Sequence, residues 1–150
     1  MKVKSDINAI APLFKHLIDG CHLLSRNVLK EEKLTLSEYY TLYLIKTDPR
    51  VKMRDVKKNL YVSGAYATGI IDKLAKKGFI RRCRREDDRR VIAVNLTDSG
   101  EKLIRKLDRK KEQFYLKFLS GMNNKDREIM RSGLLLFISS LKRVLKIKDY

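Results

Sequence analysis

The stretch Leu60–Gly100, LYVSGAYATGIIDKLAKKGFIRRCRREDDRRVIAVNLTDSG, decides the fold of this 150-residue chain. In its first part, apolar residues recur at the spacing i, i+3, i+4 and i+7, at Ala67, Ile70, Ile71 and Leu74. This spacing predicts a helix with one buried face. We expect the helix to begin near Ser63, whose hydroxyl can cap it, and to end at Gly78, where a positive φ is tolerated.

A basic β-hairpin is predicted to follow this helix directly. Phe79 and Ile80 lead into a segment from Arg81 to Arg90 that contains six arginines. Residues 91–96, VIAVNL, then have the pattern of a return strand. A short helix followed by an arginine-rich hairpin is typical of the winged helix-turn-helix, which puts side chains into two grooves of DNA. The pattern therefore indicates a DNA-binding protein.

The distribution of charge agrees with this interpretation. The chain has 35 Lys and Arg against 18 Asp and Glu, a net charge of +17, and a pI near 10.0. Residues 50–90 carry fourteen basic and five acidic side chains, whereas residues 1–49 carry seven and six. The positive excess is thus densest on the predicted helix and hairpin, as a phosphate-facing surface requires.

The residues do not support an enzyme or a metal site. The two histidines, His16 and His22, lie six positions apart on one predicted helix and so do not share a face as metal ligands would. The acidic triplet Glu86–Asp88 is interpreted as a set of salt-bridge partners for the adjacent arginines. Neither a Gly-rich phosphate loop nor a nucleophile elbow occurs in the sequence. We therefore expect no catalysis, no metal and no cofactor.

The cysteines and the apolar runs bear on the cellular compartment. Cys21 and Cys83 form no CxxC pair, which disfavours both a disulfide framework and a structural zinc. No apolar run reaches the ~18–20 residues that a membrane span needs. The first ten residues, MKVKSDINAI, lack the apolar core of a signal peptide. The expected location is the cytoplasm.

Long helices with narrow apolar stripes are predicted at both ends of the chain. Over residues 6–29 the apolar positions step by 3 and 4, at Ile7, Ile10, Phe14, Leu17, Cys21, Leu24 and Val28. The last helix, which Asn123 is expected to cap, repeats the steps at Met130, Leu134, Phe137, Leu141 and Val144. Such seams require partner helices. Two intertwined copies of the chain would cover them, and a two-fold dimer suits a palindromic DNA site.

Three further helices complete the expected organisation. Thr35–Glu38 has the form of a capping box, which predicts a helix over residues 36–47. A short helix over residues 52–59 would be the first helix of the helix-turn-helix. Thr97 is placed to cap a helix that ends before Gly121.

Two segments of the chain match a known pattern. Asp88–Gly100, DRRVIAVNLTDSG, has the order Asp, any residue, Arg, an apolar strand and then Leu-Thr-x-x-Gly. Ile71–Ile80, IDKLAKKGFI, has the pattern of the end of a recognition helix and its entry into a wing. In these segments the chain resembles the MarR family of winged helix-turn-helix transcription regulators.

The resemblance implies a mainly α-helical fold with a small β-wing, in the order four helices, hairpin, two helices. Residues 1–150 would form one domain, with a winged helix-turn-helix lobe at 35–97 and long dimerisation helices at 1–30 and 98–150. The resemblance also implies a homodimer that represses transcription from a pseudo-palindromic operator in double-stranded DNA. Release by small phenolic compounds or by oxidants is part of the same expectation.

The N-terminal turns of the predicted recognition helix carry the candidate contacts to base edges. Thr68 can offer a hydroxyl or a methyl group to a base. Gly69 disfavours a helix by about 0.8–1.0 kcal/mol relative to alanine, which suggests close approach of DNA, with a helix–helix crossing as the alternative. Asp72 would repel phosphate and is expected to pair with Lys76. The predicted DNA-binding residues are Ser63, Ala65, Tyr66, Thr68, Gly69, Lys73, Arg54, Arg89 and Arg90.

The wing and the first helix of the motif supply the remaining contacts in this hypothesis. Arg89 and Arg90, at the hairpin tip, are candidates for the minor groove or for phosphates. The resemblance implies that Asp88 positions an arginine there without touching DNA. Arg54 and Lys57 are candidates for phosphate contacts, with a solvated surface as the equal alternative.

Other interpretations stay open. Net charge alone is compatible with a non-specific architectural DNA-binding protein. Cys21 would be the switch of a redox-sensing regulator, although its place on the apolar seam favours an inert buried thiol. By the resemblance, Tyr39, Tyr40, Tyr43 and His16 are candidates for an aromatic effector pocket, with ordinary packing as the alternative.

Overall fold

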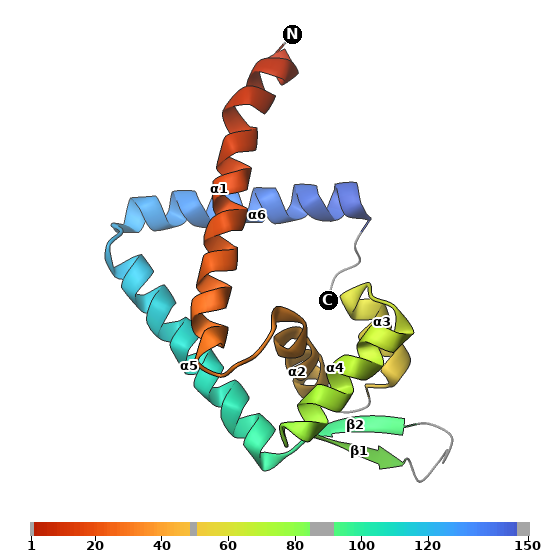
Figure 1. The fold of residues 1–150 in the computed structure, drawn as a ribbon. Helices are drawn as coiled ribbons and strands as arrows, with labels where there is room; N and C mark the ends of the chain where they lie inside the picture. The colour runs from red at the N-terminus through yellow and green to blue at the C-terminus, as the bar shows by residue number, and fades with distance from the viewer. Residues whose placement is uncertain (1, 49–50, 85–91, 147–150) are drawn as a thin grey trace. The chain divides into compact units, whose positions relative to one another are not determined.

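The structure is a computed structural model that describes residues 2–48, 51–84 and 92–146 (Figure 1). Within these ranges the fold is mainly α-helical with one small β-hairpin, as predicted. The chain divides into two compact units, Met1–Lys110 and Lys111–Tyr150. The elements run in the order α1 (Lys2–Lys30), α2 (Leu36–Thr47), α3 (Met53–Leu60), α4 (Gly64–Lys76), β1 (Ile80–Arg84), β2 (Ile92–Leu96), α5 (Asp98–Ser120) and α6 (Asn124–Leu145).

Local capping signals explain where α2 and α4 begin and end. The Thr35 hydroxyl accepts a hydrogen bond from the Glu38 N–H at 3.2 Å, and the Glu38 carboxylate accepts one from the Thr35 N–H at 2.7 Å. This is the predicted capping box of α2. The Ser63 hydroxyl accepts from the Tyr66 N–H at 3.2 Å, and Gly78 follows α4 with a φ of 74°. These predicted boundaries are confirmed.

The predicted caps of α5 and α6 are confirmed as well. The Thr97 hydroxyl accepts a hydrogen bond from the Gly100 N–H at 3.1 Å. The Asn123 side chain accepts one from the Asp126 N–H at 2.9 Å. Because α5 ends at Ser120, Gly121 breaks the helix where expected.

The hairpin is joined to the residue that precedes α3. β1 and β2 are antiparallel, and Cys83 of β1 pairs with Ala93 of β2. Lys52, directly before α3, forms an isolated bridge with the same Ala93. The predicted return strand is confirmed as β2, apart from Val91, which lies outside the described residues. The start of α3 and the wing therefore share one small sheet.

The Leu-Thr-x-x-Gly motif fastens the end of the hairpin to the end of α4. The Thr97 hydroxyl donates a hydrogen bond to the Gly78 carbonyl at 2.6 Å, besides accepting from Gly100. A Cβ atom at Gly100 would lie 2.0 Å from the carbonyl oxygen of Phe79. Only glycine fits so close to a neighbouring backbone, so the motif holds α5 against the turn between α4 and β1.

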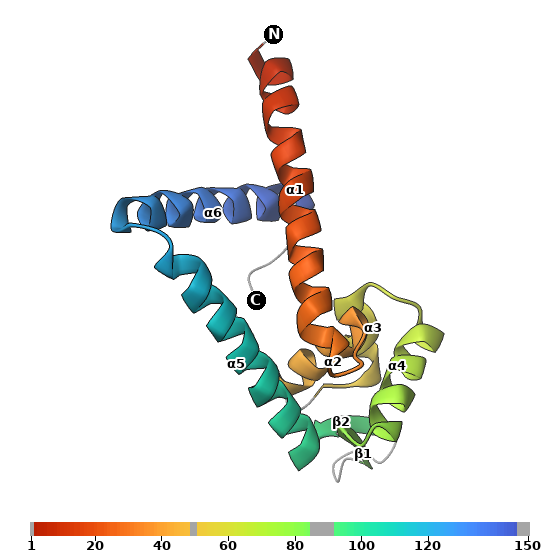
Figure 2. The same ribbon diagram turned by 60° about the vertical axis from the view of Figure 1, so that its left-hand side comes forward.

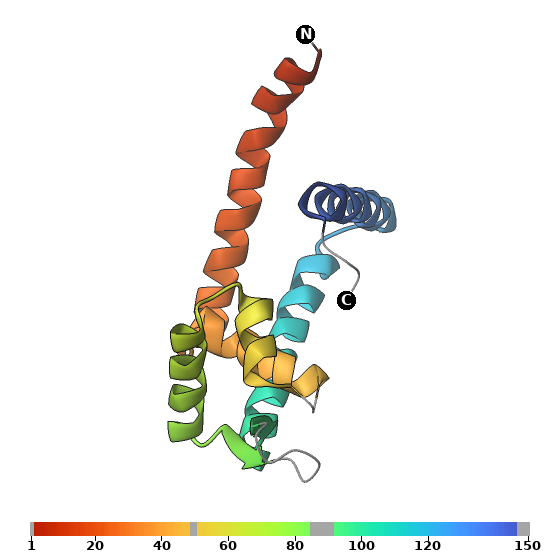
Figure 3. The same ribbon diagram turned by 90° about the vertical axis from the view of Figure 1, so that its right-hand side faces the viewer.

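The core lies beneath α4, whose four predicted core residues are all buried. Figures 2 and 3 show α4 along one side of α2 and α3, with the hairpin at its C-terminal end. Apolar side chains of α2, α3, β2 and α5 complete this core, among them Leu42, Ile45, Val56, Val94, Ile104 and Leu107. The packing leaves the opposite face of α4 open.

The terminal helices carry the predicted stripes, and many of the stripe side chains are exposed among the described residues. In α1, the side chains of Ile7, Ile10, Phe14 and Leu17 are each at least 38% exposed. None of the described residues of α6 is buried. Cys21 is exposed too, and burial of its thiol in the seam of a dimer stays a prediction. The seam at Cys21 is covered by no described element.

In the ranges that the structure describes, no helix combines the length and the apolar character that a membrane span requires.

Candidate nucleic-acid interface

The face of α4 turned away from the core carries the predicted base contacts. Ser63, Ala65, Tyr66, Thr68 and Lys73 are exposed, whereas Gly69 is half-buried. Because the Ser63 hydroxyl caps only the Tyr66 N–H, further N–H groups of the first turn point out of the helix. A helix N-terminus of this kind favours anions such as phosphate. The structure thus brings these residues together at one exposed end of α4.

Thr68 is one turn into α4 and already uses its hydroxyl proton. Its Oγ1 donates a hydrogen bond to the Gly64 carbonyl at 3.0 Å. The oxygen lone pairs and the methyl group of Thr68 remain available to a ligand. A contact with a base would therefore be made by the methyl group or by the hydroxyl as an acceptor.

Gly69 has open space where a side chain would stand. A Cβ atom built at this position meets no atom within 4 Å among the described residues. The alternative of a helix–helix crossing is therefore wrong for the single chain. Close approach of another molecule remains the interpretation of this glycine.

Asp72 does not pair as predicted. Its carboxylate binds Arg82 of β1, not Lys76 one turn later on α4. The prediction took account only of residues one turn away on the same helix. In the folded chain, the hairpin places an arginine of another element beside Asp72. The ion pair joins the exposed surface of α4 to the wing and neutralises a carboxylate that would repel phosphate.

The first helix of the motif contributes cations and an exposed tyrosine. Arg54 and Lys57 of α3 are exposed, and the Arg54 Nε lies 3.8 Å from Asp55. Asp55 also accepts a hydrogen bond from the Lys52 N–H at 2.9 Å, which fixes the start of α3. Sequence analysis missed Tyr61, which is 84% exposed and has a φ of 52° in the turn between α3 and α4. The only feature of the sequence that could have pointed to Tyr61 is its place in the predicted turn of the helix-turn-helix.

The predicted contacts at the tip of the wing are not part of the described structure. Asp88, Arg89 and Arg90 lie in the segment 85–91, outside the described residues. Of the arginines before this segment, Arg81 and Arg82 are exposed on β1. Basic side chains therefore extend from α4 onto the hairpin.

The predicted effector residues lie on two helices. The Tyr39 ring centroid is 5.4 Å from that of Tyr40 and 4.7 Å from that of Tyr43, so the three tyrosines of α2 pack together. His16 is exposed on α1. A cavity of about 460 Å³ is lined instead by residues of α2, β2 and α5, and by none of these four. Effector binding at the four residues stays a prediction.

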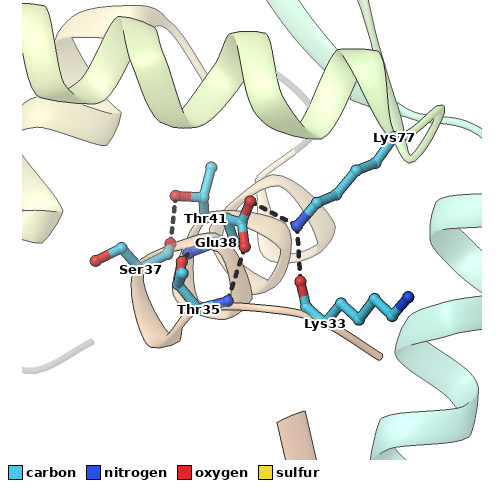
Figure 4. Close-up of polar contacts among 6 residues, drawn as sticks. All are labelled: Lys33, Thr35, Ser37, Glu38, Thr41 and Lys77. Atoms are coloured by element: carbon cyan, nitrogen blue, oxygen red, sulfur yellow. Dashed lines mark hydrogen bonds and ion pairs between the residues drawn. The ribbon is translucent and has the colours of Figure 1, made fainter. Parts of the chain in front are cut away.

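An ionic network that sequence analysis missed ties α4 to the start of α2 (Figure 4). Glu38 is only 2% exposed, and its carboxylate accepts a hydrogen bond from the Lys77 ammonium at 2.8 Å. The same ammonium donates to the Lys33 carbonyl at 2.8 Å. Burial raises the pKa of Glu38, but hydrogen bonds from Lys77 and from the Thr35 N–H outweigh this effect and lower it below its ordinary value. The capping box revealed Glu38, but no local signal pointed to Lys77.

A second ionic cluster lies on the other side of the same turn. The Lys106 ammonium is 2.7 Å from the Glu32 carboxylate, and Lys110 of α5 bonds both Glu31 and Glu32. The hydrogen bond from Lys110 lowers the pKa of Glu31, and the one from Lys106 lowers the pKa of Glu32. The turn between α1 and α2 is therefore bonded to both α4 and α5.

The chain is similar to known transcription regulators. Residues 34–92 match the model of the MarR family. YpoP, an uncharacterized HTH-type transcriptional regulator of Bacillus subtilis (strain 168), is 29% identical over 91 residues, which cover 61% of this chain and 64% of that protein. The chain thus aligns with less than two thirds of the length of this relative.

Two solved structures share the fold. Streptococcus pneumoniae FabT in complex with DNA has a TM-score of 0.80 and 25% sequence identity, and the match covers 91% of this chain and 98% of that chain. The S. aureus MepR-DNA complex has a TM-score of 0.71 and 22% identity, over 87% and 98% of the two chains. Both similarities extend well beyond residues 34–92.

Proposed function

We infer that this chain, whose residues 34–92 match the model of the MarR family, is a sequence-specific DNA-binding transcription regulator of that family. The observation that carries the inference is the exposed N-terminal half of α4, flanked by cations of α3 and the hairpin. A helix of this kind reads base edges in the major groove, while a wing reaches the backbone or the minor groove. FabT and MepR, which share the fold, have been crystallised with DNA.

We further propose a homodimeric repressor of a pseudo-palindromic operator. The exposed stripes of α1 and α6 support the dimer, because exposed apolar rows of this length are rare in monomers. In this proposal residues 35–97 form the DNA-binding lobe, and residues 1–30 and 98–150 form the dimerisation region. Two-fold symmetry of the dimer then accounts for the palindromic site.

Enzymatic activity is not part of the proposal. The matched family consists of transcription regulators, and YpoP is named as one. Release of DNA by a small phenolic compound rests on the family resemblance alone and stays a prediction. Redox sensing by Cys21 is the alternative to an inert thiol, and we expect peroxide to leave operator affinity nearly unchanged. If Cys21 is the sensor, peroxide will lower the operator affinity of the wild-type protein and leave a Cys21→Ser variant unaffected.

The test begins with the operator itself. Sequencing the duplexes that the purified protein retains from a random library should yield a pseudo-palindrome. Affinity for this operator should exceed affinity for random duplex by roughly 10³ or more at physiological salt. A ratio near one would favour the non-specific architectural protein.

Two variants then separate base reading from backbone contact. Thr68→Ala should weaken operator binding by about 1 kcal/mol and relax the preference at one base position. Thr47→Ala is a matched control, because the Thr47 hydroxyl also donates to the carbonyl four residues earlier, at 3.1 Å. Arg90→Ala should weaken both duplexes and reduce the slope of log affinity against log salt by about 0.9. Unchanged binding in Arg90→Ala would remove the wing tip from the interface.

The role of Asp88 has its own test. If Asp88 positions an arginine, Asp88→Asn should reproduce part of the Arg90→Ala effect. If Asp88 only offsets local charge, the same substitution should tighten binding to any duplex. Salt titrations of both variants on both duplexes distinguish these outcomes.

A further inference from the structure

We propose that Glu38 and Lys77 form an ionic latch that sets the position of α4 for DNA reading without touching DNA. The inference rests on the proposed function, because it takes α4 as the recognition helix. Lys77 follows the last residue of α4, whereas the predicted base contacts lie around its first turn. Figure 4 shows Lys77 reaching from the end of α4 to Glu38 and Lys33.

Glu38 does more than complete a capping box. One carboxylate oxygen, Oε2, accepts from the Thr35 N–H at 2.7 Å, as the box requires. The other, Oε1, accepts from the Lys77 ammonium at 2.8 Å. The Glu38 side chain is only 3% exposed, and a buried carboxylate without its cation is strongly disfavoured. Folding of the lobe therefore holds the two side chains together.

Lys77 bonds two segments at once. Besides Glu38, its ammonium binds the Lys33 carbonyl at 2.8 Å. Lys33 has a φ of 51°, a left-handed conformation that a non-glycine residue keeps only when surrounding contacts hold it. The C-terminal end of α4 is thus tied both to the start of α2 and to the turn that precedes it.

The same turn is bonded to α5 through Glu31 and Glu32. Lys106 and Lys110 of α5 bind Glu32 at 2.7 and 3.2 Å. Residues 31–38 therefore connect the recognition helix to α5 and to the end of α1.

The length of α4 amplifies a change at the latch. The helix has 13 residues and is about 20 Å long at 1.5 Å per residue. A tilt of ~5° at the latched end would displace its first turn by nearly 2 Å over this length. Precise contacts tolerate displacements of only about 0.5 Å. Opening the latch should therefore reduce sequence-specific binding while the phosphate-binding cations remain in place.

The experiment compares Lys77→Met, Glu38→Gln and their combination with Lys76→Met. Lys76 is the exposed neighbour of Lys77, so its substitution reports the loss of one charge at the same end of α4. Each latch variant should lower operator affinity about tenfold, equal to 1.4 kcal/mol, and change random-duplex affinity less than threefold. The salt slope should stay unchanged, and the double variant should be no weaker than the single variants. Lys76→Met should lie close to the wild type on both duplexes.

Two results would overturn the proposal. Equal weakening on both duplexes with a salt slope reduced by about 0.9 would make Lys77 a phosphate contact. Operator affinity that is unchanged in every latch variant would show that the latch does not position α4.

A measurement without DNA separates the latch from the proposed function. Backbone amide exchange of residues 33–38 and 74–77 should be faster in Lys77→Met than in Lys76→Met, with circular dichroism showing that both variants are folded. If the wild-type protein shows no operator preference, the proposed function fails. In that case, equal exchange in the two variants would also overturn the latch.

Discussion

The central lobe and the terminal helices bury their apolar residues to opposite extents. Leu42, Ile71 and Leu74 of the lobe are fully buried, whereas Ile7 of the α1 stripe is 56% exposed and Val144 of the α6 stripe is 77% exposed. Both regions have regular helical patterns in the sequence. A regular pattern therefore predicts that a face will be buried, and it does not say whether the same chain provides the cover.

The difference follows from the number of elements that meet in each region. α4 packs against α2, α3 and β1 of the same chain. On the stripes of α1 and α6, side chains such as Ile10 and Leu134 stay more than 40% exposed. In the proposed dimer, a second copy of the chain covers these stripes. The stability of the terminal helices should then depend on protein concentration, whereas that of the lobe core should not.

The largest effect is expected from a charge in a terminal stripe. Leu17→Asp would place a carboxylate in the α1 seam and should raise the dimer dissociation constant at least about a hundredfold, because an uncompensated charge is not tolerated in an apolar contact. Light scattering should then give 17.6 kDa in place of twice that mass. Asn8→Asp, off the seam, should remain dimeric. A dimeric Leu17→Asp variant would show that the seam of α1 lies outside the interface.

The same measurement applies to α6. Phe137→Asp places the charge in the second seam and should also give the mass of one chain or unfold the protein. Circular dichroism distinguishes these two outcomes. A folded dimer would restrict the interface to α1.

A core substitution in the lobe should come next in magnitude. Leu74→Ala should reduce the free energy of unfolding by about 2–5 kcal/mol, because it leaves a cavity among fully buried neighbours. Urea titration at two protein concentrations measures it, and the loss should be the same at both. Leu13→Ala, at an exposed position of α1, should cost less than ~1 kcal/mol. A comparable loss at Leu13 would mean that α1 is as well covered as the lobe.

Alanine at two glycines of the lobe should change stability in opposite directions. Gly100→Ala should destabilise by about 1–3 kcal/mol, because its Cβ would stand 2.0 Å from the Phe79 carbonyl oxygen. Gly69→Ala should instead stabilise by up to ~1 kcal/mol through helix propensity, since its Cβ meets open space. Thermal unfolding compares them. A destabilised Gly69→Ala would indicate a neighbour that the single chain does not provide.

The smallest effect is expected on thermal stability at acid pH. The folded-state pKa of Glu38 lies below its ordinary value of 4.5. The ionised carboxylate therefore contributes stability above pH 4.5, and this contribution is lost as the pH falls through the lowered pKa. Between pH 5 and pH 3, Glu38→Gln should lose less thermal stability than the wild type. Glu112→Gln, at an exposed position of α5, should follow the wild type. A wild-type pH dependence in Glu38→Gln would contradict the assigned role of Lys77.

Sequence analysis succeeded where the deciding interactions are short-range. The Ser63 cap, the Thr35–Glu38 capping box and the left-handed Gly78 each involve residues within four positions of the helix end. The buried face of α4 follows from its period alone. Hydrogen bonds and steric limits of this range belong to the local chain, so they can be predicted without knowing the fold.

It failed where a distant element intervenes. Asp72 was expected to bind Lys76, but the hairpin offers Arg82. The cap residue Glu38 gave no sign of its second partner, which lies 39 positions away. Helical periodicity predicts which residues share a face of one helix. It does not predict ion pairs between separate elements.

Local sequence patterns account for the helices, their caps, the hairpin and the apolar stripes of α1 and α6, because periodicity and capping act over one or two turns. The contacts between side chains of different elements depend on the tertiary structure. It set Lys77 on Glu38 and Lys110 on Glu31 and Glu32, and it brought Gly100 against Phe79. Such contacts depend on the packing of whole helices, in which the distance along the chain no longer limits which residues are neighbours.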